Sequence, residues 1–137
     1  LKAYKNMNAY KLFVLDVGLL GAMSELPAES ILEGNDIFVE FKGALTEQYV
    51  LQQLISDSPY TPYYYGNEKA TFEQDFLIQK AKSIVPIEVK AEQNIRSHSL
   101  KTYCEKFQPE EAVRFSTLKY KEQERMVNIP LYAVCNL

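Results

Sequence analysis

The sequence predicts an α/β sandwich in which a mixed central sheet is flanked by helices. A helical pattern from about residue 37 to 55 precedes three extended segments at 62–65, 71–79 and 83–90. A second helix is predicted up to about Phe107, and a further strand at 112–117. The order helix, three strands, helix, strand allows helices to cover both faces of the sheet.

The N-terminal third is predicted to extend this core. The apolar run KLFVLDV at 11–17 predicts a short buried strand, and Gly18 to Met23 predicts a brief helix. Asn35 or Asp36 can cap the long helix, which must end before Pro59 because the residue preceding a proline disfavours helical geometry.

The later elements are read from their flanking residues. Gly66 to Lys69 and Lys80 to Lys82 are predicted turns. Ser97 or Ser99 can cap the second helix, and Pro109 closes it. The apolar tail at 126–134 is interrupted by a proline, so the sequence does not decide its secondary structure.

A chain of 137 residues suits one domain. We expect residues 1–34 to form an N-terminal extension, 35–117 the core and 118–137 a C-terminal extension. Because the first residue is Leu, we expect the chain, 1–137, to be a fragment of a longer protein.

Composition limits the classes of function. The net charge is -3 and the pI about 5.3, so a polyanion would have to meet a local basic patch. No apolar run could span a bilayer and no signal peptide is evident, which predicts a cytoplasmic protein without a membrane partner. His98 is the only histidine, which excludes a multi-histidine zinc site. Cys104 and Cys135 lack metal-type spacing and are expected to be reduced, core-filling thiols.

Two carboxylates are predicted to meet in the hairpin formed by 71–79 and 83–90. A turn at Ala81 and Lys82 places Asp75 directly opposite Glu88, with Cβ atoms about 5 Å apart. Like charges at this distance destabilise the fold unless a cation lies between them, and oxygen ligands of this kind suit Mg²⁺. Lys90 shares the face of Glu88 and is either an ion-pair partner or a group that orients water or phosphate.

The long helix contributes a fourth candidate. Glu47 begins an apolar stripe with Val50, Leu51 and Leu54, which faces the sheet. Its carboxylate either reaches solvent or a lysine, or serves as an additional metal ligand or a group supporting one.

Together these features resemble the PD-(D/E)XK, or restriction-endonuclease-like, superfamily, whose core is αβββαβ. More closely, the chain resembles the uncharacterised C-terminal domain attached to AAA+ ATPase modules in bacteria and archaea. The segments that carry the likeness are Leu15–Leu20, the Glu47 helix, Glu73–Phe76, Pro86–Lys90 and Asn128–Tyr132. The literal Pro-Asp pair is missing, since Gln74 precedes Asp75.

The resemblance implies roles for these residues. Asp75 and Glu88 would be metal ligands, Lys90 the motif lysine, and Glu47 the helix acid, with Mg²⁺ or Mn²⁺ as the cofactor. It also implies an ATP-binding N-terminal AAA+ module outside this sequence, which contains no G-x-x-x-x-G-K-[ST] motif.

Two functional interpretations follow, and a third is a purely structural fragment. The first is a Mg²⁺-dependent phosphodiester hydrolase acting on nucleic acid, with DNA favoured over RNA. The second is a catalytically inactive nuclease-fold module that binds a partner, forms a homodimer or regulates the ATPase.

Weaker features could support nucleic-acid binding, although a solvated surface and core packing explain them as well. They are the basic residues Arg96, Lys101, Lys106 and Arg114 and the tyrosines Tyr60, Tyr63, Tyr64 and Tyr65.

Overall fold

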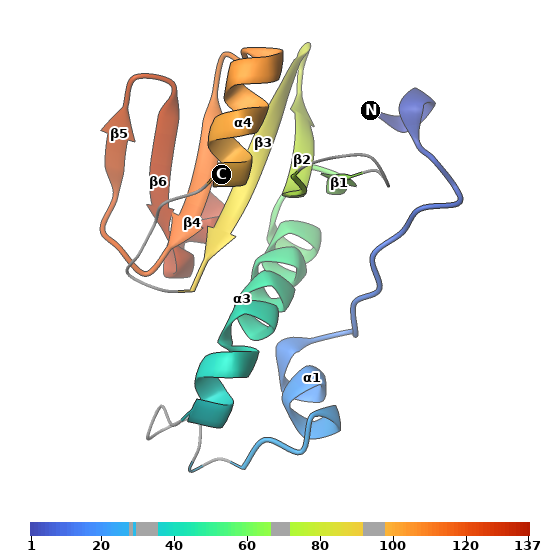
Figure 1. Ribbon diagram of the computed structural model, residues 1–137, viewed down its shortest axis with the longest axis vertical. Coiled ribbons are helices and arrows are strands. Elements are labelled where there is room, and N and C mark those ends of the chain that lie inside the picture. Colours follow the sequence, from blue (N-terminus) through green and yellow to red (C-terminus); the bar gives the residue numbers. More distant parts are fainter. Residues whose placement is uncertain (28, 30–35, 67–71, 92–97) are drawn as a thin grey trace.

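The fold is a six-stranded mixed sheet with helices on both faces (Figure 1). The computed structural model describes residues 1–27, 29, 36–66, 72–91 and 98–137. The strand order is β1-β2-β3-β4-β6-β5. The strands are β1 (Tyr63–Tyr65), β2 (Gln74–Lys80), β3 (Ser83–Lys90), β4 (Ala112–Ser116), β5 (Lys121–Gln123) and β6 (Met126–Pro130). β1, β2 and β3 are antiparallel neighbours, β4 is parallel to both β3 and β6, and β5 is antiparallel to β6.

One face of the sheet packs against helix α3 (Asp36–Asp57) and the C-terminal 3-10 helix η2 (Leu131–Asn136). Val50 and Leu54 of α3 and Val134 of η2 are fully or almost fully buried against alternate residues of the central strands. Alternation in a strand sends every second side chain to this face, which explains why an apolar stripe on α3 suffices to cover it.

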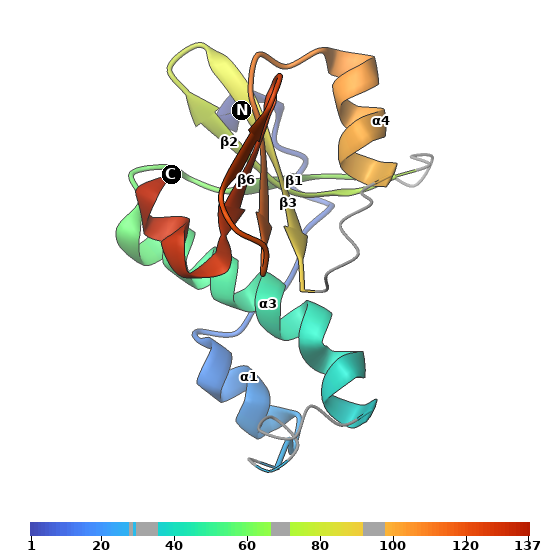
Figure 2. The ribbon, with the colours of Figure 1, turned by 90° about the vertical axis from the view of Figure 1, so that its left-hand side faces the viewer.

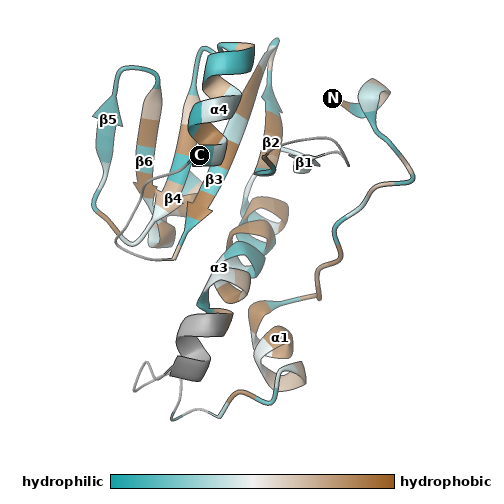
Figure 3. Cartoon of the chain, viewed as in Figure 1, coloured by the Kyte–Doolittle hydropathy of each residue, from teal (hydrophilic) through white to brown (hydrophobic). Residues whose placement is uncertain are grey.

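Helix α4 (His98–Phe107) covers the opposite face. Its Tyr103 packs with Phe72 and Leu77, and the ring of Tyr65 from β1 completes this smaller cluster. Figure 2 shows α4 and η2 on opposite sides of the sheet. The edge strand β5 is fully exposed and hydrophilic, whereas the inner strands are largely hydrophobic (Figure 3).

The N-terminal segment contains a short 3-10 helix η1 (Lys2–Tyr4), an extended stretch and helix α1 (Val17–Met23), which Asp16 caps. The prediction of a strand at 11–17 is wrong. The Val14 amide donates to Gln48 Oε1 at 3.1 Å, and Gln48 Nε2 donates back to the Val14 carbonyl at 3.0 Å. Gln52 Oε1 accepts from the Val17 amide at 3.0 Å. Two glutamines of α3 therefore supply the partners that a neighbouring strand would have provided, and we call residues 11–17 the N-terminal strap.

The remaining elements follow the predicted order closely. The predicted tail resolves into β6 and η2, and β5 was not anticipated. Ser99 lies inside α4 and is not its cap, whereas the alternatives Asn35 and Ser97 lie outside the described residues. None of the described helices is both long enough and apolar enough to span a bilayer.

The cysteines do not fill the core as expected. Both are free thiols, with Cys104 half-buried on α4 and Cys135 exposed. In the tight η2 turn the inward position belongs to Val134, which leaves its neighbour Cys135 facing solvent.

Candidate functional site

The candidate site lies where β2 and β3 part. The two strands pair from Lys80 and Ser83 to Phe76 and Ile87, which is the predicted register. Asp75 and Glu88 are the next residues along the two strands. From there Glu88 pairs in register with Arg114 of β4. Beyond the last paired residues, the negative charge of Glu88 acts on Asp75, so the two carboxylates interact electrostatically at this end of the hairpin.

Asp75 is held by a backbone amide, and its surroundings raise its pKa. Its Oδ2 accepts a hydrogen bond from the Val89 amide at 2.8 Å, a contact that takes the place of a ladder bond. Burial raises the pKa of Asp75 to about 7, with further contributions from the negative charges of Glu88 and Glu47. The Val89 amide and the positive charge of Lys11 oppose this rise. Asp75 therefore exchanges a proton near neutral pH.

Glu88 is buried, with 3% of its surface exposed, and is held by two neighbours. Its Oε1 lies 2.8 Å from Lys90 Nζ, and its Oε2 accepts from Gln74 Nε2 at 3.2 Å. Burying a carboxylate is costly unless it has such partners. The sequence-predicted neighbour Lys90 is thus an ion-pair partner of Glu88 in this structure.

Gln74 directly precedes Asp75 on β2 and is fully buried. Its Nε2 also donates to the Ile87 carbonyl at 2.7 Å. Because both neighbours of Nε2 are acceptors, this orientation of the amide is the only one that satisfies them. The orientation leaves Gln74 Oε1 buried without a hydrogen-bond partner among the described residues. A buried orphan carbonyl costs stability and is the kind of oxygen that a cation or a water can satisfy.

Glu47 is paired with the N-terminal strap. Lys11 Nζ lies 2.8 Å from Glu47 Oε1, and about a quarter of each side chain is exposed. Burial acts to lower the pKa of Lys11, but the hydrogen bond and charge of Glu47 outweigh it, together with the charges of Asp75 and Glu73. The pKa of Lys11 is consequently raised. The positive charge of Lys11 offsets the negative charges of Glu47 and Asp75.

A buried polar network supports the other side. Arg114 Nε donates to Asn128 Oδ1 at 3.0 Å, and Ser116 Oγ donates to the same oxygen at 2.7 Å. Asn128 Nδ2 in turn donates to the Lys119 carbonyl at 3.0 Å. Burial lowers the pKa of Arg114, and the charge of Glu88 opposes that change. The expected basic rim is therefore not formed by Arg114, which is only 5% exposed because it lies opposite Glu88.

The other members of that rim are also engaged or undescribed. Lys101 pairs with Glu105 at 3.8 Å, and Lys106 Nζ lies 5.0 Å from the centroid of the Phe107 ring. Arg96 lies outside the described residues.

Comparison with known families decides the assignment of the chain. A family described as a domain of unknown function (DUF4143) matches residues 42–134. The chain belongs to the DUF4143 family. DUF4143 domains are commonly found in proteins associated with AAA ATPases. Comparisons with curated proteins and with solved structures gave no match. The matched span of the DUF4143 domain includes Glu47, Asp75, Glu88 and Lys90 but not Lys11.

The donor atoms of this DUF4143 domain fit a hard divalent cation. Asp75, Glu88 and the orphan Gln74 Oε1 offer only oxygen, the ligand type of Mg²⁺ and Mn²⁺. Within the described part of the chain no three His, Cys, Asp or Glu side chains form a ready-made metal cluster. The two acids would therefore need the amide oxygen, water or substrate to complete a coordination shell.

Sequence reasoning missed Lys11, Gln74 and Arg114 as parts of the candidate site. Lys11 is separated from Glu47 by 36 positions, and no local pattern announces the contact. Gln74 could have been found, since it directly precedes Asp75 on a strand. The burial of Arg114 could have been anticipated from parallel pairing of 112–117 with the strand that carries Glu88.

Proposed function

We propose that this DUF4143 domain is a divalent-cation-dependent phosphodiester hydrolase with a restriction-endonuclease-like core, acting on DNA in preference to RNA. The observation that supports it most is the electrostatic interaction of Asp75 with Glu88 where β2 and β3 part, together with the 2.8 Å ion pair between Lys90 and Glu88. The proposal places the domain in the cytoplasm beside an AAA+ ATPase module that couples ATP use to its activity.

In this proposal Asp75, Glu88 and the carbonyl of Gln74 would hold Mg²⁺ or Mn²⁺, with Glu47 close by. When bound, such an ion polarises a phosphate and lowers the pKa of water. The Gln74 amide and Lys90 orient the Glu88 carboxylate. Lys90, about a third exposed, can turn toward a phosphate and balance its charge.

The inactive, partner-binding module is a second candidate, and one observation favours it. The N-terminal segment and α1 expose large apolar side chains, with Leu12 86%, Leu15 84% and Met23 65% exposed. Apolar surface gathered in one segment is typical of an interaction site. Such a module, or a homodimer, would keep binding its partner when Asp75 is neutralised.

Cleavage assays separate the two candidates. Labelled single- and double-stranded DNA and RNA are incubated with the chain in Mg²⁺ or Mn²⁺, beside the variants Glu88→Gln and Lys90→Ala. We expect each variant to lose at least about a hundredfold in rate, the scale of a lost transition-state contact. Lys101→Ala, which breaks an exposed ion pair of the same type, serves as the matched control. Cleavage that persists unchanged in Glu88→Gln would exclude the hydrolase.

A further inference from the structure

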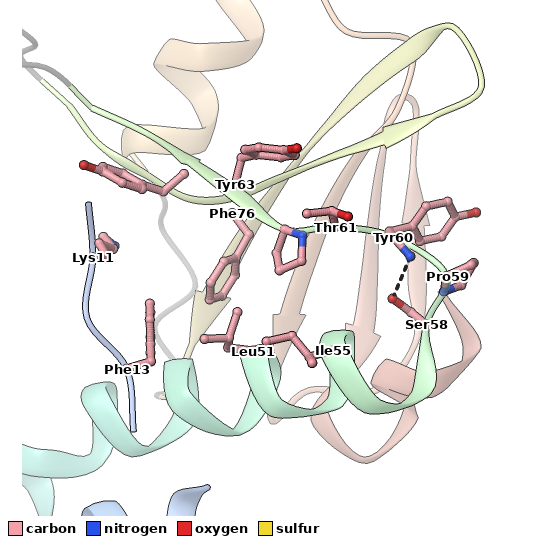
Figure 4. Close-up of a pocket in the computed structure, with 12 residues that line it drawn as sticks. Lys11, Phe13, Leu51, Ile55, Ser58, Pro59, Tyr60, Thr61, Tyr63 and Phe76 are labelled. Atoms are coloured by element: carbon pink, nitrogen blue, oxygen red, sulfur yellow. Dashed lines mark hydrogen bonds between the residues drawn. The ribbon is translucent and has the colours of Figure 1, made fainter. Parts of the chain in front are cut away.

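Two hollows lie along the N-terminal segment and meet at Lys11. The first, of about 560 Å³, is bounded by α3 on one side and residues 58–64 on the other, with Lys11 and Phe13 at one end (Figure 4). The second, of about 630 Å³, lies between residues 1–11 and 61–66. Each has the size of an ordinary ligand pocket. Lys11, Tyr63 and Tyr64 line both, so the two hollows are neighbours beside the edge strand β1, and we treat them together as one groove.

The lining of this groove is largely apolar and aromatic, and its charged side chains are Lys5 and Lys11. We call it the tyrosine–lysine groove and define it by Lys5, Tyr10, Lys11, Tyr63 and Tyr64. No carboxylate lines either hollow among the residues that the structure describes. The chain as a whole has a net charge of -3, whereas this surface carries lysines and favours an anionic ligand.

Several of these side chains are available to a ligand. Tyr10 is 71% exposed. Tyr64 is half-buried and belongs to neither hydrophobic cluster, and Lys11 Nζ lies 5.7 Å from the centroid of its ring. Tyr65 differs, because its ring packs against Phe72 and is part of the fold. The groove thus presents aromatic surface that folding does not use.

The groove leads to the carboxylate site. Lys11 lines both hollows and is bonded to Glu47, and its charge interacts with that of Asp75. The ion pair with Glu47 is partly exposed, and such pairs contribute little stability. Lys11 can therefore exchange Glu47 for an incoming phosphate.

We propose that the tyrosine–lysine groove binds single-stranded nucleic acid, with bases stacked on Tyr10 and Tyr64 and phosphates held by Lys5 and Lys11. Unpaired bases expose flat apolar faces that stack on tyrosine, whereas a duplex buries them. Lys5, and Lys11 once it exchanges Glu47 for a phosphate, supply the positive charge that matches the phosphate backbone. An extended peptide could pair with the edge of β1 but would make no use of the lysines. Binding stands independently, and only delivery of the strand to Asp75 and Glu88 rests on the proposed hydrolase.

The test is fluorescence anisotropy with a labelled oligothymidine in EDTA, where metal-dependent cleavage cannot occur. We expect the oligothymidine to bind more tightly than a duplex of equal length. Tyr64→Leu should weaken binding about tenfold, the lower part of the range for one lost stacking contact. Lys11→Met should reduce the slope of log affinity against log salt by about 0.7, whereas Tyr64→Leu should leave that slope unchanged.

Controls make each outcome decisive. Tyr132→Leu removes a tyrosine that is 82% exposed on η2, outside the groove, and should bind as the unaltered chain does. Lys5→Met alters an exposed side chain and keeps the test open if Tyr64→Leu fails to fold. Equal affinity in Tyr64→Leu, or binding insensitive to salt and matched by an uncharged extended peptide, would overturn the proposal. Binding without cleavage in Mg²⁺ would instead leave the groove intact and remove the hydrolase.

Discussion

Replacing Asp75 by Asn should stabilise the chain, and the gain should depend on pH. The pKa of Asp75 is about 7 in the folded chain, against an ordinary value of 3.8. Below about pH 4 the Asp75 carboxyl is protonated in both the folded and unfolded states, so burying it does not lower the free energy of unfolding. Between about pH 4 and 7 the unfolded state loses the proton while the folded state retains it, so stability falls as pH rises. Above pH 7 Asp75 is ionised in both states, and the loss of stability is complete.

The two pKa values of Asp75 set the size of the stability gain expected for Asp75→Asn. A change from 3.8 to about 7 corresponds to about 4 kcal/mol, at about 1.4 kcal/mol for each tenfold change in proton affinity. This is an upper limit, since relaxation and water reduce the penalty of a partly exposed acid. Asn has nearly the same shape, stays neutral at every pH and can still accept the Val89 amide. Asp75→Asn should therefore match the unaltered chain near pH 4 and exceed its stability by up to about 4 kcal/mol at pH 8.

Urea unfolding followed by circular dichroism at pH 4, 6 and 8 measures this difference, provided that the denaturant dependence is unchanged. Asp57→Asn is the control, because Asp57 is an exposed carboxylate at the end of α3, and surface changes usually stay within about 0.5 kcal/mol. Mg²⁺ should narrow the gap at pH 8 by stabilising only the chain that retains the acid. Asp75→Asn that destabilises at pH 8, or a difference independent of pH, would refute the placement of Asp75 beside Glu88 in a buried site.

Two further predictions concern the supports of the site. Gln48→Leu removes both hydrogen bonds to Val14, should cost about 1–2 kcal/mol and should speed hydrogen exchange at the Val14 amide; unchanged exchange would contradict the strap. Asn128→Ala removes the oxygen that accepts from both Arg114 and Ser116, and should lower the free energy of unfolding by about 2–4 kcal/mol. Urea unfolding measures this loss, and a loss below about 0.5 kcal/mol would show that the network is not needed for stability.

The hairpin was the part of the site that local sequence could specify. A two-residue turn and alternation leave few registers, so the pairing from Lys80 and Ser83 to Phe76 and Ile87 followed from counting along the strands. The positive φ of 51° at Ala81 shows that the turn lies where it was expected. The apolar stripe on α3 was equally local, and it placed Val50 and Leu54 in the core.

The predictions that failed concern residues whose contacts lie far away in the sequence. The run at 11–17 has the composition of a strand, but composition does not say whether a strand or a pair of glutamine side chains will satisfy its backbone. Lys11 pairs with Glu47 across 36 positions of sequence, a contact that no periodicity encodes. Arg114 was expected in a basic rim because arginine is usually exposed, and only the pairing of β3 with β4 shows that it lies beside Glu88.

The central claim is that Asp75 and Glu88 form a cation site, and calorimetric titration with Mg²⁺ and Mn²⁺ tests it most directly. The chain is compared with the Asp75→Asn, Glu88→Gln double variant, after circular dichroism has shown that both are folded. The account predicts saturable binding by the unaltered chain, accompanied near pH 7 by proton release from Asp75, and loss of that binding in the double variant. Binding of equal strength in both proteins would contradict the claim, because the ion would then lie somewhere other than between these two carboxylates.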